Sequence, residues 1–242
     1  MSSRDAILGR IRNALVHEPP RERPPVPQVW PRENPGADAM AGRFAQELAE
    51  VYGESFRVAS MDDARRKLAE LAEASGWTSI GAVDRPLCRE LLAGLAPHRV
   101  VWAGQGEKGD SPHLPERPEG CRAQMGTVPF FPQTPQNMAE LSLGVVEADY
   151  LLADTGSAMI ACGTPQERLL CYLPPACVVI ATVERLAEHL PAAWGEIARR
   201  AAAPELRGEF VFVTGPSRTA DIEKVLILGV HGPKRLVVLV VG

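Results

Sequence analysis

The stretch that decides the fold reads SFRVA (55–59), SMDDARRKLAELAEA (60–74), TSIGAVD (78–84), RPLCRELLAG (85–94) and HRVVWAG (98–104). The first, third and fifth runs are short and apolar, as strands are, and the two runs between them have the spacing of amphipathic helices. Strands that alternate with helices in this way are typical of a parallel sheet in an α/β protein. We therefore predict an open, mostly parallel sheet with helices on both of its faces.

The second half of the chain adds strand candidates that follow one another closely. They read VVEADYLLA (145–153), SAMIAC (157–162), RLLCYL (168–173) and ACVVIAT (176–182). These runs leave little room for crossover helices, so at least one pair should be antiparallel. Beyond them, the pattern predicts helices over 183–190 and 192–202, a strand over 209–215, a helix over about 219–226 and a last strand over 234–242.

The amino-terminal part differs from this pattern. Residues 3–16 have an apolar face typical of a helix, and residues 19–35 contain seven prolines, which favour an extended and semi-rigid chain. We predict a helical arm and proline-rich linker over 1–36, followed by an α/β domain over 37–242. An isolated helix of this length is only marginally stable in water. Its apolar face should therefore dock on the body of the chain or on another subunit, as in a homo-oligomer, and the sequence leaves both alternatives open.

Composition and charge exclude several classes of protein. The chain has 242 residues, of which 45% are hydrophobic and 23% are charged, as in ordinary globular proteins. Its formal net charge of −4 gives no reason to expect nucleic acid as a partner. The apolar stretches are far shorter than the roughly 20 residues that a membrane-spanning helix needs. We predict a cytoplasmic protein with no membrane insertion.

Cysteine and histidine spacing gives no sign of a metal site or of a resident cofactor. The chain has five cysteines and none of them forms a C-x-x-C pair, so reduced and mostly buried thiols are expected. The five histidines are not paired at metal-ligand spacing. The sequence Gly104-Gln-Gly-Glu-Lys-Gly109 matches a dinucleotide-binding pattern, but Pro112 and Pro115 stand where the following helix should begin, so a loop is expected.

A first candidate site follows the apolar run at 147–153. Asp154 comes directly after this run and is followed by Thr155, Gly156 and Ser157. A carboxylate at the end of a strand could act as a base or nucleophile, and the residues after it could bind an anion. The alternative is a plain β-turn, in which Asp154 bonds the backbone of Gly156 and Gly156 has a positive φ angle.

A second candidate site lies between the strand at 209–215 and the helix expected after it. Backbone N–H groups of a helix N-terminus would converge there with two hydroxyls and a guanidinium, which suits a phosphate or carboxylate. The alternative is a plain helix cap formed by Ser217 or Thr219. His231 could reach the same pocket as a second catalytic group, or could bond a turn carbonyl. The anion-binding residues proposed here are Gly215, Ser217, Arg218 and Thr219.

Several of these motifs carry a resemblance to a known family. GPSRTADIE (215–223), GVHGP (229–233), ADYLLADTGS (148–157) and LLCYLPPACVVIAT (169–182) resemble LUD-domain proteins of the lactate utilization protein C type. Many relatives have Thr-Gly-Thr after the aspartate, where this chain has Ser157, so a hydroxyl is kept. The resemblance implies a fold similar to the NagB/RpiA/CoA-transferase group.

The resemblance also implies a function. It points to an accessory subunit in the oxidation of L-lactate to pyruvate, acting with iron–sulfur partner proteins that carry the redox clusters. The second hypothesis is a stand-alone enzyme with CoA-transferase-like or sugar-phosphate-isomerase-like chemistry on a small organic anion, and it rests on fold analogy alone.

Overall fold

A computed structural model describes residues 3–15, 30, 32–95, 100–103, 135–202, 209–220 and 226–242. The chain divides into two compact units, residues 1–31 and 32–242. The first unit holds helix α1 (Ser3–Leu15), as predicted, and its Ile7 and Ile11 are 57% and 50% exposed. Sequence features outside the described residues are the loop from Gly104 to Gly109, most of the proline-rich linker, Cys121, His17, His98 and His113.

The second unit is built on a six-stranded sheet in which every neighbouring pair of strands is parallel. This arrangement confirms the predicted α/β class. Apolar side chains of the two central strands are almost entirely buried, as expected for a parallel sheet that is covered on both faces. In sheet order the strands are β1 (Glu54–Val58), β12 (Arg235–Val241), β7 (Ala176–Thr182), β4 (Leu143–Glu147), β2 (Ile80–Val83) and β3 (Val100–Ala103).

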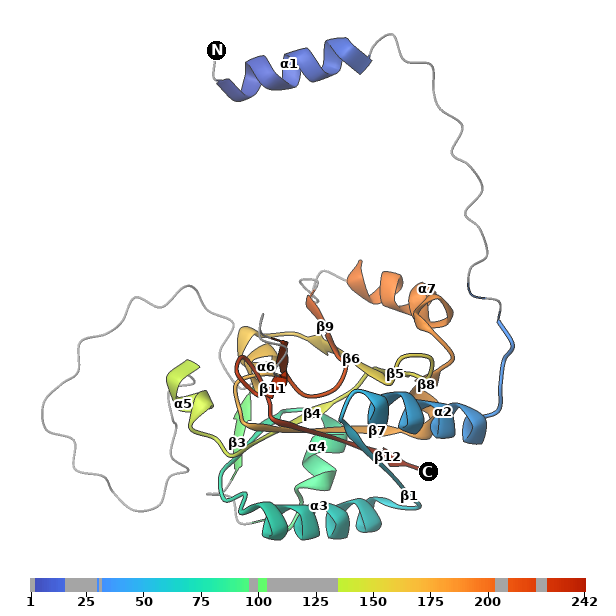
Figure 1. Cartoon of the computed structure of the whole chain (residues 1–242), viewed down its shortest axis with the longest axis vertical. Helices are drawn as coiled ribbons and strands as arrows, with labels where there is room; N and C mark the ends of the chain where they lie inside the picture. Colours follow the sequence, from blue (N-terminus) through green and yellow to red (C-terminus); the bar gives the residue numbers. More distant parts are fainter. Residues whose placement is uncertain are drawn as a thin grey trace, which may run out of the picture. The chain divides into compact units, whose positions relative to one another are not determined.

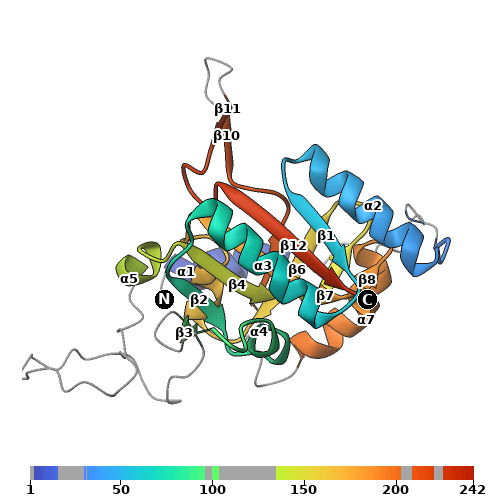
Figure 2. The same cartoon turned by 90° about the horizontal axis from the view of Figure 1, so that it is seen from below.

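Helices cover both faces of this sheet. Helices α3 (Met61–Ser75) and α4 (Pro86–Leu91) lie together on one face (Figure 2). Helix α6 (Pro165–Leu170) packs against β2 and β4, and the backbone carbonyl of Leu170 leaves no room for a Cβ atom on Gly144. Helix α2 (Ala37–Glu50) packs beside β1 through Phe44 and Leu48, and a short helix α5 (Pro135–Ala139) precedes β4.

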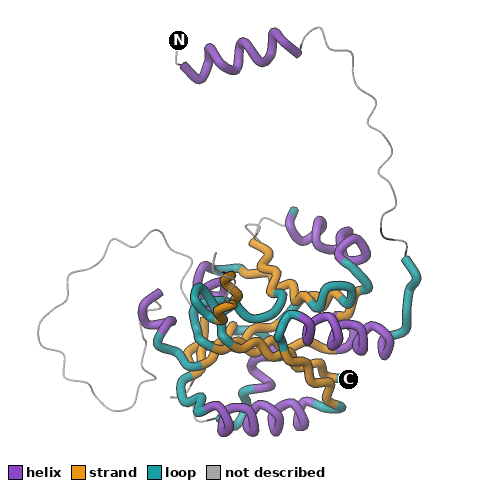
Figure 3. Tube along the Cα trace, in the orientation of Figure 1, coloured by secondary structure: helices purple, strands orange, loops and turns teal. Residues whose placement is uncertain are grey.

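A second sheet of four strands lies beside the main one (Figures 1 and 3). Strand β6 pairs antiparallel with both β5 and β9, which confirms the predicted antiparallel pairing. Helix α7 (Leu190–Ala201) packs on this sheet through Ala193 and Ile197, which contact Met159. The strands are β8 (Leu186–Ala187), β5 (Tyr150–Leu152), β6 (Ser157–Cys162) and β9 (Glu209–Val213).

The structure corrects two predicted strands. The run at 145–153 is divided, because β4 ends at Glu147 in the main sheet and β5 begins at Tyr150 in the second sheet. The run at 168–173 belongs mainly to helix α6, because Thr164 caps a helix that Pro165 opens.

Two predicted helices are also wrong. Residues 183–190 form a 3-10 turn, η2 (Val183–Arg185), and strand β8, because Leu186 and Ala187 pair with β5. In place of a helix at 219–226, the described residues form strands β10 (Arg218–Ala220) and β11 (Leu226–Leu228), which pair antiparallel. This hairpin extends away from the main sheet (Figure 2). Within the described part of the chain, no helix is long and apolar enough to cross a membrane.

Candidate functional site

Two turns that the sequence singled out meet in the structure. The turn from Ala153 to Gly156 joins β5 to β6, and residues 214–217 follow β9. The hydroxyl oxygens of Ser157 and Thr214 are 2.6 Å apart, so the two turns are hydrogen-bonded to each other. Gly156 and Gly215 both have positive φ angles and lie against the backbone of α2 and of the residue after it. The structure therefore brings Gly156, Ser157 and Gly215 together; Thr155 is exposed on the first turn.

Asp154 has an environment that differs from the simple turn considered above. Its backbone N–H donates to the carbonyl of Glu188 at 3.1 Å, which ties this turn to the end of β8. Its Oδ1 atom is buried and has no hydrogen-bond partner within the described structure. A buried carboxylate oxygen without a hydrogen-bond partner lowers the stability of the fold by about 1–3 kcal/mol or more. Such a group in a folded protein calls for an explanation, and a functional role is one.

Glu188 and His189 adjoin Asp154, and sequence reasoning missed both. The Glu188 carboxylate accepts hydrogen bonds from the backbone N–H groups of Glu33 and Asn34, with its two oxygens 3.0 and 3.2 Å from the Glu33 nitrogen. His189 caps α7: its Nδ1 accepts from the Ala192 N–H at 3.0 Å, so in the neutral ring the proton lies on Nε2. Among the described residues, that Nε2 atom is buried without a hydrogen-bond partner, and it is 4.0 Å from Glu188 Oε2. The signal that could have revealed this cap is Pro191, which marks the start of a helix.

Ser217, Arg218 and Thr219 do not lie at a helix N-terminus. Arg218 and Thr219 are strand residues of β10, so the helix dipole that supported the anion site is absent at this position. The backbone of Ser217 is bonded to the turn 229–233, because its N–H donates to Pro233 and its carbonyl accepts from Gly229, both at 2.8 Å. An anion-binding role for these three residues remains a prediction that rests on their hydroxyl and guanidinium groups alone.

His231 lies in a half-open cavity of about 450 Å³ between this turn and the segment before β7. The main-chain N–H of Lys234 donates to the carbonyl of Pro175 at 2.8 Å, which joins the two walls. Because β7 and β12 begin directly after these walls, the cavity lies at the amino edge of the parallel sheet. No hydrogen bond or ion pair links His231 to Asp154 among the described residues, so the structure does not pair these two predicted catalytic groups.

The carboxyl edge of the main sheet carries a buried ionic network instead. Asp149, which is 0% exposed, binds both terminal nitrogens of Arg85 at 2.8 and 3.0 Å, Arg200 at 2.5 Å and the Ala161 N–H at 2.7 Å. Glu147 accepts from the Leu87 N–H at 2.9 Å. Burial would raise the pKa of Asp149, but the hydrogen bonds and charge of Arg85 outweigh it and hold that pKa below its usual value.

This network occupies the place where an open α/β sheet commonly binds ligands. The chain leaves β2 toward β3 on one side and leaves β4 toward β7 on the other, so the strand order reverses between β2 and β4. Arg85 follows β2, and Asp149 follows β4. Ligands of such sheets bind outside the strand ends at this switch point. Here the charged groups satisfy one another, which favours a structural role.

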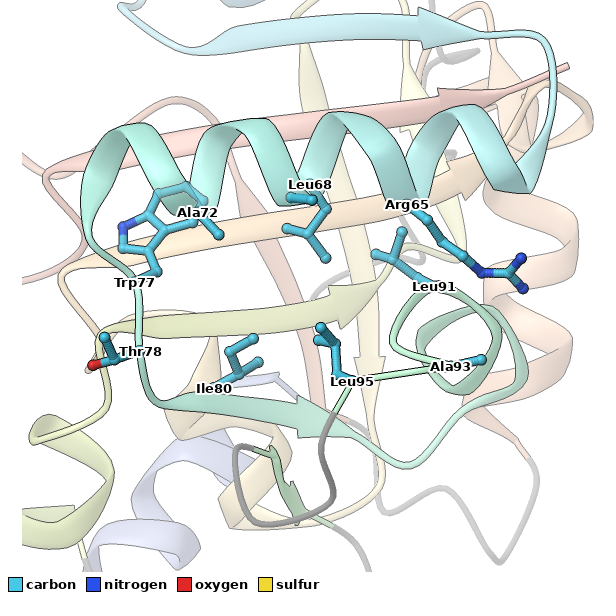
Figure 4. A pocket seen from close by; sticks show the side chains of 10 residues that line it. Arg65, Leu68, Ala72, Trp77, Thr78, Ile80, Leu91, Ala93 and Leu95 are labelled. Atoms are coloured by element: carbon cyan, nitrogen blue, oxygen red, sulfur yellow. The ribbon is translucent and has the colours of Figure 1, made fainter.

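A smaller apolar cavity of about 90 Å³ lies on the face of the main sheet that α3 and α4 cover (Figure 4). Leu68, Trp77 and Leu91 surround it, together with Ile80 at the start of β2. Its lining offers no cluster of titratable groups. Across the described residues, no group of three His, Cys, Asp or Glu side chains is placed to hold a metal ion.

Comparison with known proteins finds similarity to one domain family and to a solved structure of similar fold. Residues 131–241 match the model of the LUD domain. The chain is 33% identical to lactate utilization protein C of Halalkalibacterium halodurans over 103 residues, which cover 42% of this chain and 45% of that protein. For the protein of the same name from Bacillus pumilus, the identity is 33% over 103 residues, or 42% and 43% of the two chains. The matched stretch thus spans less than half the length of these relatives.

Two further matches extend over more of the chain. The Escherichia coli protein YkgG is 29% identical over 159 residues, which cover 64% of this chain and 66% of that protein. The crystal structure of a DUF162 family protein from Deinococcus radiodurans aligns with 86% of this chain and 99% of its own, with a TM-score of 0.53 at 12% identity. These findings confirm the resemblance to LUD-domain proteins and the α/β fold.

Proposed function

We propose, from the LUD-domain match over residues 131–241, that this chain is a component of lactate utilization that supports the oxidation of L-lactate to pyruvate. The observation that carries the proposal is the similarity to proteins named lactate utilization protein C. Asp154, Ser157, Glu188, His189 and His231 all lie inside the matched range.

The redox chemistry of this role is assigned to iron–sulfur partner proteins. Four of the five cysteines are described, and all four are buried. Burial raises the pKa of Cys177 to about 12 and also raises that of Cys88, so these thiols stay protonated near neutral pH. Metal clusters are held by thiolates, which makes these cysteines poor ligands for one. The chain is therefore proposed to act as a cytoplasmic accessory subunit.

The small organic anion is proposed to bind at the two hydrogen-bonded turns, residues 153–156 and 214–217. Ser157 and Thr214 supply hydroxyl groups there, and Thr155, Gly156 and Gly215 supply backbone. A second candidate function, a stand-alone enzyme acting on a small organic anion, is favoured by one observation. Within the part of the chain that the structure describes, Asp154 Oδ1 and His189 Nε2 are both buried without a hydrogen-bond partner, as an acceptor and a donor available for proton transfer would be.

Growth on L-lactate tests the proposed function. A strain that lacks the gene should fail to grow on L-lactate as the carbon source, and the wild-type gene should restore growth. Normal growth of the deletion strain on L-lactate would show that the proposed function is wrong.

Asp154→Asn tests the carboxylate within that role. The substitution keeps the size of the side chain and removes its charge, so growth on L-lactate should fall although the protein accumulates normally. Asp62→Asn, on the exposed side of α3, is the matched control and should support full growth. If Asp154→Asn grows like the wild type, Asp154 serves only as a turn residue.

Affinity purification of the tagged full chain from lactate-grown cells tests the partners. Iron should co-purify with the complex and be lost when a salt wash removes the partner proteins. Iron retained by the washed chain would place the cluster on this chain and contradict the assignment.

A further inference from the structure

The cavity of about 450 Å³ at the amino edge of the main sheet has two different walls. One wall comes from Tyr172, Leu173 and Pro175, which stand between α6 and β7. The other is the turn 229–234, which leads from the hairpin into β12. A cavity of this volume lies within the range of roughly 300–1,000 Å³ that small-molecule sites occupy.

The second wall presents hydrogen-bond donors and positive charge. Lys234 lines the cavity and is exposed, and His231 lines it beside Lys234. Among the described residues, the backbone N–H groups of Val230, His231 and Gly232 donate to no protein acceptor. Successive free N–H groups in a turn form a concave donor surface that binds anions, and a lysine supplies the charge that holds a phosphate or carboxylate.

The shape of this turn depends on its glycines. Gly229 has a φ angle of 78°, and a Cβ atom there would collide with the side chain of Lys234. A Cβ atom on Gly232 would lie 3.0 Å from Cβ of Ser217. The two glycines thus allow Lys234 and Ser217 to pack closely against the turn, whose residues line the cavity.

We propose that this cavity binds an organic anion of about nucleotide size, with its phosphate or carboxylate at Lys234 and the 230–232 turn. Its less polar part would lie against Tyr172, Leu173 and Val230, which give the rest of the cavity an apolar and aromatic surface. L-lactate, with one carboxylate, one hydroxyl and one methyl group, fills only a small part of such a volume. The ligand is therefore a second molecule and not the lactate of the proposed function, so this inference does not depend on that function.

Binding of adenosine 5′-monophosphate to the purified full chain, measured by titration calorimetry, tests the proposal. The nucleotide should bind saturably, and adenosine, inorganic phosphate and L-lactate should each bind more weakly, because each offers only part of the required chemistry. Lys234→Gln should weaken nucleotide binding about ten-fold or more, as expected for loss of a charge-assisted contact. Lys234→Arg should retain most of it.

Two further variants keep the result interpretable. Val230→Glu adds a negative charge at an exposed cavity residue without disturbing the core, and should weaken binding of the nucleotide more than that of adenosine. Arg43→Gln, an exposed change on α2, should leave binding unchanged. The proposal is overturned if the wild-type chain shows no saturable binding of the nucleotide. It is also overturned if Lys234→Gln binds it as tightly as the wild type, or if L-lactate binds equally well and competes.

Discussion

Replacing Asp149 with alanine is expected to lower the free energy of unfolding by about 3–5 kcal/mol, the range measured when one partner of a buried ion pair is removed. Asp149 is completely buried and joins three parts of the fold: Arg85 after β2, Arg200 on α7 and the Ala161 N–H in β6. Its removal leaves the Arg200 guanidinium and the Ala161 N–H without this acceptor, and it leaves Arg85 with its contacts to Glu147 at 3.3 Å. Urea unfolding of both proteins at neutral pH measures the loss.

The charge of Asp149 can be separated from its shape with Asp149→Asn. The pKa of Asp149 is lowered in the folded protein, so its ionised form contributes stability above its unfolded pKa and loses it as the pH falls through the folded value. The stability difference between wild type and Asp149→Asn should therefore be largest near neutral pH and shrink in acid. Asp62→Asn, which alters an exposed pair within one helix, should cost less than about 1 kcal/mol. An Asp149→Ala protein as stable as the Asp62→Asn control would contradict the role given to the network.

The sequence predicts the main sheet because its signals there are local. Apolar strands alternate with capped amphipathic helices from Glu54 onward, and α3 has its cap at Ser60 as the pattern requires. Periodicity fails where tertiary pairing decides. Leu186 and Ala187 fit a helix by pattern, but they form a strand because β5 offers a partner. Likewise, Thr219 pairs with Ile227 in a hairpin that no helix-start signal could reveal.

The candidate site could be predicted only in part for a related reason. The turn after Asp154 and the one before Ser217 are visible as motifs, and the Ser157–Thr214 hydrogen bond joins them. Glu188 carries no motif, because its position depends on how β8 pairs, and the only signal for His189 is Pro191 at the start of α7. The sequence pattern also does not reveal that residues 145–153 are divided between two sheets. The division places Asp149 between the sheets, where it binds Arg85 and Arg200, which lie 64 and 51 residues away along the chain.

Gly156→Ala should destabilise the protein much more than an alanine substitution at another glycine of the same backbone conformation. Gly156 has a φ angle of 62°, and a Cβ atom there would lie 2.4 Å from the backbone nitrogen of Leu48 and 2.7 Å from its Cα. The obstacle is the backbone of α2, which cannot rotate away as a side chain can. Gly76, the cap that ends α3, has a φ angle of 68°, and a Cβ atom there would meet nothing within 4 Å. The pair therefore separates the cost of the left-handed conformation from the cost of the collision.

Gly76→Ala should cost about 1 kcal/mol, because only the left-handed conformation is penalised. Gly156→Ala should cost about 3 kcal/mol or more, since the overpacking term of about 1–3 kcal/mol is added and the collision is with backbone. Parallel urea unfolding curves measure both values, and equal costs at the two positions would contradict the close packing of this turn on α2. Because Ser157 follows directly, the shift that accommodates alanine should also lengthen the Ser157–Thr214 contact. Growth on L-lactate should then fall for Gly156→Ala at a temperature where the protein is still folded, whereas Gly76→Ala should grow like the wild type.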